Sequence, residues 1–286
     1  MKLIKPSFKI LEQSSGIEGI YKMIEIAGRT AYKSEDKITE GSAKKFVNRM
    51  ISVNHGSPLE HGTVYLKISS FEPVDNIINT LKNNPYTRCN SVVETFNIKD
   101  GKAAHITYYI STNFRVLLEN NLLDVLKYLC EPTEYHEKRI CVRFILSRSI
   151  AQEFTRHRVF SFLMESQRYC DYSKNKFNNE VTFILPSWIT TKYLNIGQEC
   201  FTISDIEWSA SLVASEKSYF ELLKQGWKPQ EAREVLPNAT KTELIMTGFV
   251  SDWKYFFLLR CDNAAHPSAR ELAIPLKEEF INRKFI

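Results

Sequence analysis

The sequence lacks the patterns by which metal and nucleotide-phosphate sites are most easily recognised. Its six cysteines include no CxxC pair, so no zinc knuckle or dithiol redox motif is predicted. It contains neither a GxGxxG nor a GxxxxGK loop, so neither a Rossmann nor a P-loop nucleotide site is indicated. His55, Glu60 and His61 are close in sequence, but they lie across a proline turn and not on one helix. We therefore expect no metal site.

Strong net charge and long apolar runs are also missing. The net charge of +5 suits a small anionic substrate but is too weak to indicate nucleic-acid binding. No segment approaches the roughly 20 apolar residues of a membrane-spanning helix. The first ten residues, MKLIKPSFKI, contain no apolar signal core. We expect a cytoplasmic protein with no membrane partner and no nucleic-acid partner.

Hydrophobic periodicity and turn residues predict an α+β fold. We expect one domain over residues 1–286, with a small, mostly antiparallel sheet flanked by helices. Helices are predicted over 16–32, 42–52, 111–129, 147–158, 204–226, 229–236, 238–248, 252–260 and 269–280, and strands over 62–69, 105–111, 139–146 and 181–188. The expected helix starts are the N-caps Ser42, Ser147 and Ser251, the capping box of Ser204 with Glu207, and Pro229, while Pro275 interrupts the last helix.

The stretch 155–169, TRHRVFSFLMESQRY, sets three arginines among aromatic residues, with Glu165 as its one acid. A helix over 147–158 would bring Arg156, His157 and Arg158 to its C-terminus, where cations are favourable in any protein. However, Ser166 and Gln167 follow as neutral hydrogen-bonding groups, and Arg168 as a fork for phosphate or carboxylate. The whole stretch is therefore interpreted as one site with two anion-binding ends.

Two more arginines stand in apolar helical runs, Arg233 in EAREVLP and Arg260 at the end of DWKYFFLLR. Taken alone, Arg260 could be an ordinary cation at a helix C-terminus. Arg233 could be a surface residue paired with Glu231 or Glu234. Either arginine becomes informative only together with the stretch 155–169.

These segments together resemble the flavin-dependent thymidylate synthases. Arg156, His157, Arg158 and, after seven more residues, Ser166 form the family's RHRx7S signature. HGSPLEHGTVYLKI upstream, ESQRYCDYSK just after, and EAREVLPN and FFLLRCDNAAHPSARELA downstream resemble further family segments, in the same order. The stretch 71–137 is longer than in compact members, which is typical of a long-chain subgroup.

The resemblance implies a homotetramer with active sites shared between subunits. Such an enzyme methylates dUMP to dTMP, with 5,10-methylenetetrahydrofolate as carbon donor and FAD, reduced by NADPH, as hydride source. Residue by residue, it implies dUMP contacts for Glu153, Arg156, Glu165, Ser166, Gln167, Arg168, Arg233 and Arg260, and FAD contacts for His55, Ser57, Arg156, His157 and Arg158. Arg260 is the implied catalytic residue, because it matches the arginine that stabilises the uracil anion.

Four positions depart from the family pattern. Phe249 and Ser251 stand where the pattern has an asparagine and an arginine that touch FAD, and Tyr255 replaces a polar residue. Met164 stands where some members have a glutamate, although Glu165 is the next residue. Two alternatives to a thymidylate synthase therefore stay open at this point. One is a related flavin-dependent pyrimidine-nucleotide hydroxymethylase, and the other is a non-catalytic nucleotide-binding relative.

Overall fold

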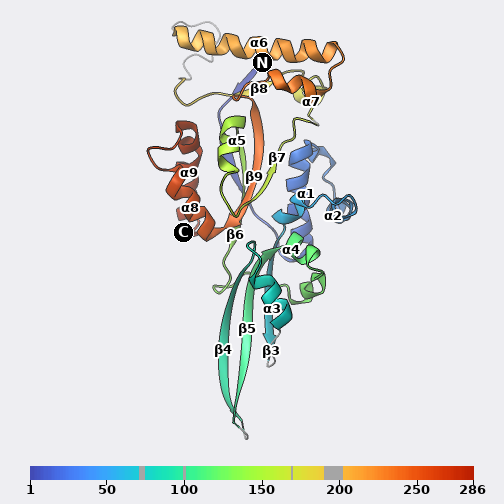
Figure 1. The fold of residues 1–286 in the computed structure, drawn as a ribbon, viewed down its shortest axis with the longest axis vertical. Helices are drawn as coiled ribbons and strands as arrows, with labels where there is room; N and C mark the ends of the chain where they lie inside the picture. The colour runs from blue at the N-terminus through green and yellow to red at the C-terminus, as the bar shows by residue number, and fades with distance from the viewer. Residues whose placement is uncertain (71–74, 99–100, 169, 190–201) are drawn as a thin grey trace.

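The computed structural model describes all of the chain except residues 71–74, 99–100, 169 and 190–201. Its described part contains helices and mainly antiparallel strands, which confirms the predicted α+β class (Figure 1). The strands form three sheets, however, and not one. The expectation of a single domain over 1–286 stays a prediction.

The central sheet has four antiparallel strands in the order β2 (Ser7–Leu11), β6 (Arg139–Ser147), β9 (Lys241–Phe249) and β7 (Ser161–Met164). A three-stranded antiparallel sheet has the order β3 (Thr63–Ser70), β5 (Gly101–Asn113) and β4 (Arg88–Ile98). The short strands β1 (Lys2–Ile4) and β8 (Thr182–Ile184) pair in parallel. The β4–β5 hairpin extends away from the rest of the molecule (Figure 1).

The described helices cover both sides and one end of the central sheet and also pack against the three-stranded sheet. They are α1 (Gly16–Tyr32), α2 (Ser42–Ser52), α3 (Asp75–Lys82), α4 (Phe114–Glu119), α5 (Arg148–Phe154), α6 (Ile203–Lys224), α7 (Pro229–Ala232), α8 (Val250–Arg260) and α9 (Pro267–Asn282). Figure 1 shows α8 and α9 on one side of the central sheet, α1 on the other, and α6 across one end. No described helix, the 22-residue α6 included, is long and apolar enough to cross a membrane.

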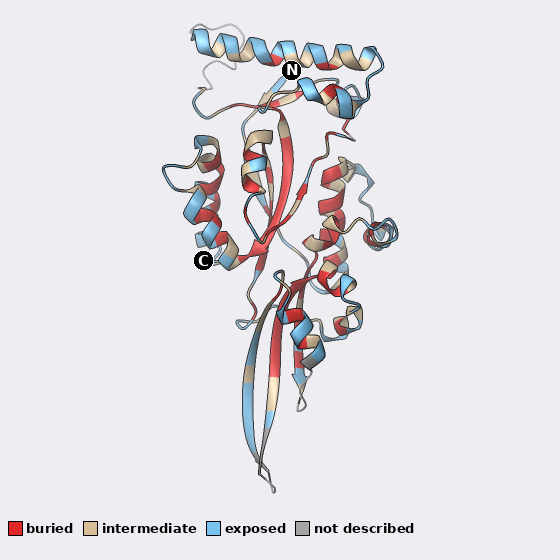
Figure 2. Ribbon diagram, viewed as in Figure 1, coloured by how far each residue is buried: buried red, intermediate tan, exposed pale blue. Residues whose placement is uncertain are grey.

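Strand β9 is the centre of the core, and it corrects the predicted helix over 238–248. Leu244 and Met246 pack into the cluster formed with α5, α8 and α9, whereas Ile245 packs against α1. Successive side chains of a strand point to opposite faces, and both faces of β9 are buried (Figure 2). A strand buried on both faces reads as a continuous apolar run, which periodicity alone cannot distinguish from a buried helix.

The predicted helix over 111–129 was confirmed only in part. Strand β5 continues to Asn113, whose side chain accepts a hydrogen bond of 3.0 Å from the Val116 amide and so begins α4. Helix α4 ends after six residues, and the 3₁₀ helix η3 (Leu123–Tyr128) follows it. Asn113, a favoured N-cap residue, is the sequence feature that could have predicted the start of α4.

Several helix ends differ from the predicted ones. Gly41, not Ser42, precedes α2, because the Ser42 hydroxyl bonds the Thr39 amide and Glu25. Helix α6 has its capping box at Thr202 and Asp205, not at Ser204 and Glu207. Ser251 is not the cap of α8; Asp252 accepts from the Phe249 amide at 3.2 Å. Helix α5 ends at Phe154, so Arg156, His157 and Arg158 lie beyond it, in a turn.

Other predicted boundaries were confirmed. The Ser147 side chain accepts from the Ile150 amide at the start of α5. Pro229 is the first residue of α7. Pro275 lies inside α9, which continues past it to Asn282. Helix 16–32 is α1 over the same residues.

We expect Phe256→Ala to lower the free energy of unfolding by about 3–5 kcal/mol, the usual cost of emptying a buried phenylalanine site. Phe256 is fully buried between Phe154 and Trp253, with ring centroids at 5.0 and 5.3 Å. Tyr255→Ala on the same helix is the control, because Tyr255 is 56% exposed. Urea unfolding followed by circular dichroism measures both. Equal losses in the two variants would contradict the assigned packing of α8.

Candidate functional site

The end of α8 and the end of α5 meet in a cluster of three of the predicted site residues. Arg260 Nη1 donates to Glu153 Oε2 at 2.8 Å, and Nη2 donates to the Glu153 backbone carbonyl at 2.9 Å. Arg260 Nε donates to His157 Nε2 at 2.9 Å. Because three bonds fix the guanidinium, its position is set before any ligand binds.

The His157 ring in this cluster is neutral. Burial, followed by the charge of Arg260, lowers the pKa of His157 to about 4. An arginine can only donate hydrogen bonds, so Nε2 must be the accepting nitrogen and Nδ1 carries the proton. The ring also packs edge-on to Phe256 at 5.0 Å. His157 therefore positions Arg260 without adding a second positive charge.

The two arginines on either side of His157 face solvent. Arg156 and Arg158 are exposed, and neither guanidinium group forms a hydrogen bond or an ion pair within the part of the chain that the structure describes. A guanidinium without a protein partner is free to take a bidentate anion. Arg158 also lies near Tyr86 of the long stretch 71–137. Burial raises the pKa of Tyr86, and the positive charge of Arg158 acts against that rise.

The predicted flavin residues His55 and Ser57 lie near the C-terminal end of α1. His55 Nδ1 is 2.8 Å from the Tyr32 hydroxyl, and Ser57 begins the 3₁₀ helix η2 (Ser57–His61). The turn between them lies against Arg115, since a Cβ added at Gly56 would be 2.7 Å from Arg115 Nε. Arg115 in turn pairs with Glu60 at 2.6 Å.

Residues 165–168 lie past the opposite end of β7 from His157. The Glu165 amide donates to the Glu243 carbonyl at 2.8 Å, and the Ser166 amide donates to the Ala31 carbonyl at 2.9 Å. Glu165 and Gln167 are buried, whereas Arg168 is exposed. The structure therefore brings Ser166 to the same end of α1 as His55 but separates it, by the length of β7, from Arg260.

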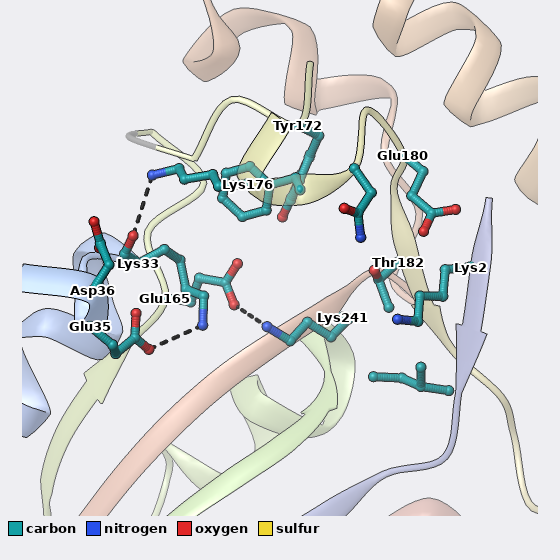
Figure 3. Close-up of a pocket in the computed structure, with 13 residues that line it drawn as sticks. Lys2, Lys33, Glu35, Asp36, Glu165, Tyr172, Lys176, Glu180, Thr182 and Lys241 are labelled. Carbon is teal, nitrogen blue, oxygen red and sulfur yellow. Dashed lines mark hydrogen bonds and ion pairs between the residues drawn. The ribbon is translucent and has the colours of Figure 1, made fainter. Parts of the chain in front are cut away.

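A pocket of about 530 Å³ opens beside Glu165 (Figure 3). Glu165 Oε2 accepts from Lys241 at 2.7 Å, while its other oxygen is buried and has no described partner. Lys33 and Tyr172 also line the pocket. Four lysines and four carboxylates line this pocket. Such a lining, with a buried carboxylate oxygen still to be satisfied, suits a ligand that carries both an anionic group and hydrogen-bond donors.

The chain was compared with known proteins. A family model described as "Thymidylate synthase complementing protein" matches residues 133–283. The chain belongs to this Thy1 family. A flavin-dependent thymidylate synthase of Pyrococcus abyssi is 31% identical over 138 residues, 48% of this chain and 52% of that one. A protein of the same name from Synechocystis is 32% identical over 147 residues, 47% of this chain and 62% of that one. The chain spans about half the length of the Pyrococcus relative.

The Thy1 match covers both halves of the RHRx7S motif but not the segment that holds His55 and Ser57. A crystal structure of the UMP/dUMP methylase PolB from Streptomyces cacaoi aligns with 99% of this chain and 93% of its own, at 16% identity. Its TM-score of 0.43 is too low to support a conclusion. The roles of the individual site residues in this Thy1 protein therefore stay predictions.

Arg233 is the remaining member of the predicted dUMP set, and the residue before it, Ala232, packs in one cluster with Cys170 and Tyr172. It begins the 3₁₀ helix η6 (Arg233–Val235) and lies 3.6 Å from Glu234. This long and half-exposed ion pair holds the side chain weakly.

Among the described residues no group of three or more His, Cys, Asp or Glu side chains is arranged to hold a metal ion.

Sequence reasoning missed Lys33, Lys241 and Glu243, which form the charged wall behind the pocket. Lys33 Nζ and Lys241 Nζ each lie 2.6 Å from Glu243 Oε1, and Arg143 Nε donates to Glu243 Oε2 at 2.7 Å. Lys241 and Glu243 are two apart on β9, so they share a face. The spacing of Lys241 and Glu243 would have placed both side chains on one face of a strand. This signal was missed because residues 238–248 were predicted to form a helix.

Protonation of Glu243 should lower the stability of the folded protein in acid. Burial raises the pKa of this carboxyl, but Lys241 and Lys33 outweigh burial and lower the pKa to about 2, from 4.5. A lowered folded-state pKa gives stability that is present above about pH 4.5 and is lost as pH falls toward 2. The shift corresponds to roughly 3 kcal/mol.

The Glu243→Gln variant tests this prediction through urea unfolding between pH 6 and pH 3. The variant should be less stable at pH 6, and the difference from the parent protein should shrink as the pH falls. The surface change Glu278→Gln, on α9, is the matched control. A difference that stays constant with pH would show that Glu243 is not ionised in the folded protein.

Proposed function

We propose that this protein is a flavin-dependent thymidylate synthase, which methylates dUMP to dTMP. The family match and the names of the relatives support this activity. The structural observation that carries it is the Arg260 guanidinium, held by Glu153 and by a neutral His157. Glu153 and Arg260 match dUMP contacts of the family that the sequence resembles, and His157 matches an FAD contact.

The fixed guanidinium explains how the uracil ring could be activated without a nucleophile from the protein. Carbon 5 of uracil becomes more nucleophilic when negative charge on the ring is stabilised, and a positioned arginine supplies that stabilisation. The five cysteines of the described chain do not offer a competing thiolate, since burial raises the pKa of each. The pKa of Cys141 rises to about 11 and that of Cys170 to about 12. We therefore assign the catalytic role to Arg260.

The remaining predicted residues would bind and orient the ligands. Exposed Arg156 and Arg158 offer unpaired guanidinium groups to anionic groups of dUMP and FAD, and His55 and Ser57 would contact the flavin. Ser166, Gln167 and Arg168 would hold the nucleotide, with Arg168 at its phosphate, and Arg233 would add a further contact. When bound, FAD reduced by NADPH supplies a hydride, and 5,10-methylenetetrahydrofolate supplies the carbon.

The separation of the two dUMP groups favours a site completed by a second copy of the chain. Arg260 and Glu153 lie at one end of β7 and residues 165–168 at the other, which is too far apart for one uracil ring to contact both. Large apolar side chains also stay uncovered, among them Leu258 on α8 (69% exposed) and Ile203 on α6 (81% exposed). Such surface is typical of subunit contacts. We infer a homotetramer with shared active sites.

Arg260→Ala should lower turnover by about two orders of magnitude or more, because it removes a preorganised charge at the reacting ring. Tritium release from 5-tritiated dUMP, with methylenetetrahydrofolate and NADPH, measures the loss. The variant should still be yellow, because Arg260 is not one of the predicted flavin contacts. Mass analysis of the product distinguishes dTMP from its hydroxymethyl analogue.

Arg283→Ala is the matched control for this experiment. Arg283 is a surface arginine paired with Glu12 and Glu279 at 2.6 Å, so its removal should leave turnover unchanged. Near-normal activity of Arg260→Ala would refute the assigned role. A parent protein that binds no FAD would refute the proposed function.

The tetramer predicts a mass of about 133 kDa, four times 33.3 kDa, by light scattering after gel filtration. Leu258→Glu should shift the mass toward smaller species if the exposed face of α8 is a subunit contact, because it places a charge in an apolar interface. Lys44→Glu, at an exposed position of α2 on the other side of the central sheet, is the control. A monomeric parent protein with full turnover would exclude shared active sites.

A further inference from the structure

A second pocket, of about 340 Å³, lies where the N-terminus of α1 meets the start of β6. None of the predicted dUMP or FAD residues lines it. Two of its lining residues, Arg139 and His61, are buried polar residues, at 6% and 0% exposed. The pocket therefore needs an explanation separate from the proposed reaction.

Arg139 is a buried cation whose bonds all go to uncharged oxygens. Its guanidinium donates to the Glu60 and Thr112 carbonyls at 3.3 and 3.4 Å, to Thr63 Oγ1 at 3.3 Å and to Ser161 Oγ at 3.2 Å. Charge-assisted bonds to a carboxylate are typically about 2.7–2.9 Å long. The Nε of Arg139 has no partner among the described residues.

No carboxylate within the described ranges lies at ion-pair distance from Arg139. The carboxylates nearby are engaged elsewhere, since Glu60 pairs with Arg115 and Asp252 pairs with Arg88. A buried charge is costly unless it is paired, by several kcal/mol per ion. Burial accordingly lowers the pKa of Arg139. A guanidinium in this state can pair with an anion that enters the pocket.

The N-terminus of α1 lies at the same pocket through Ser15 and Gly16. Ser15 is the N-cap residue, but its side chain makes no capping bond. Gly16 follows with φ 73°, and a Cβ there would meet no atom within 4 Å. Helix α1 has 17 residues, so its first amide groups carry the positive end of a full helix dipole.

His61 supplies a neutral hydrogen-bonding group beside Arg139. Its Nδ1 lies 2.8 Å from Thr247 Oγ1, and its Nε2 is buried without a described partner. Burial, followed by the charge of Arg139, lowers the pKa of His61 to about 3. The ring therefore stays neutral and adds no charge that would bind a second anion.

We propose that this pocket binds a small organic monocarboxylate with an apolar body, whose carboxylate pairs with Arg139 beside the Gly16 amide at the start of α1. Ile20, Met23 and Leu129 give the pocket apolar walls, which suits a hydrocarbon or aromatic body. Glu12 and Glu131 also line it, and their charges disfavour a phosphate dianion. The site is independent of the dUMP and FAD residues.

Fluorine NMR with 4-fluorobenzoate tests the site directly. The probe should bind saturably, whereas 4-fluorobenzamide, its neutral counterpart, and inorganic phosphate as a competitor should bind at least tenfold more weakly. Arg139→Gln should weaken binding tenfold or more, the loss expected for a charged hydrogen-bond partner. Arg49→Gln, an exposed arginine on α2, should change nothing.

A second variant keeps the test decisive if Arg139→Gln does not fold. Leu129→Trp should fill the pocket and abolish binding, and Leu126→Trp is its control, because Leu126 is similarly half-buried but does not line the pocket. Absence of saturable binding to the parent protein would overturn the proposal and leave Arg139 a structural residue only. Binding that survives Leu129→Trp, or tighter binding of phosphate, would overturn it as well.

Discussion

The Arg139 guanidinium is the contact on which the joint between the two larger sheets depends. It belongs to β6 of the central sheet, yet it donates to Thr63 of β3 and to the carbonyl of Thr112 in β5. The buried bond between His61 and Thr247 of β9 crosses the same joint. Buried hydrogen bonds of this kind are costly to leave unmade, so they fix how the three-stranded sheet sits on the central one.

The position of Arg260 follows from that joint through β9 and α8. Phe249, the last residue of β9, lies beneath the guanidinium groups of Arg88 and Arg139, whose carbons are 4.4 and 5.5 Å from its ring centre. Helix α8 begins at the next residue and buries Trp253, Phe256 and Phe257 against the sheet. This aromatic core sets the rotation of α8, and its last residue then meets Glu153 and His157.

Ion pairs stabilise the opposite end of the central sheet. There Glu243 of β9 is surrounded by Arg143 of β6, Lys241 and Lys33. Since Lys33 follows directly after α1, these ion pairs tie the end of α1 to the sheet, close to His55 and Ser166. The two ends of the molecule thus present different chemistry: a guanidinium fixed by neutral and charged acceptors, and a lysine-lined pocket with a buried carboxylate.

The sequence by itself determined the family, through the RHRx7S motif, and the elements whose pattern is local. The amphipathic α1, the strand β6 and the serine cap of α5 could be predicted because neighbouring residues decide them. The contact of Arg260 with His157 joins residues 103 apart, and the ion pair of Lys33 with Glu243 joins residues 210 apart. The tertiary structure decided these contacts, and also the strand conformation of β9. A residue pattern records the period of one segment, whereas burial on both faces and long-range pairing depend on what packs against that segment.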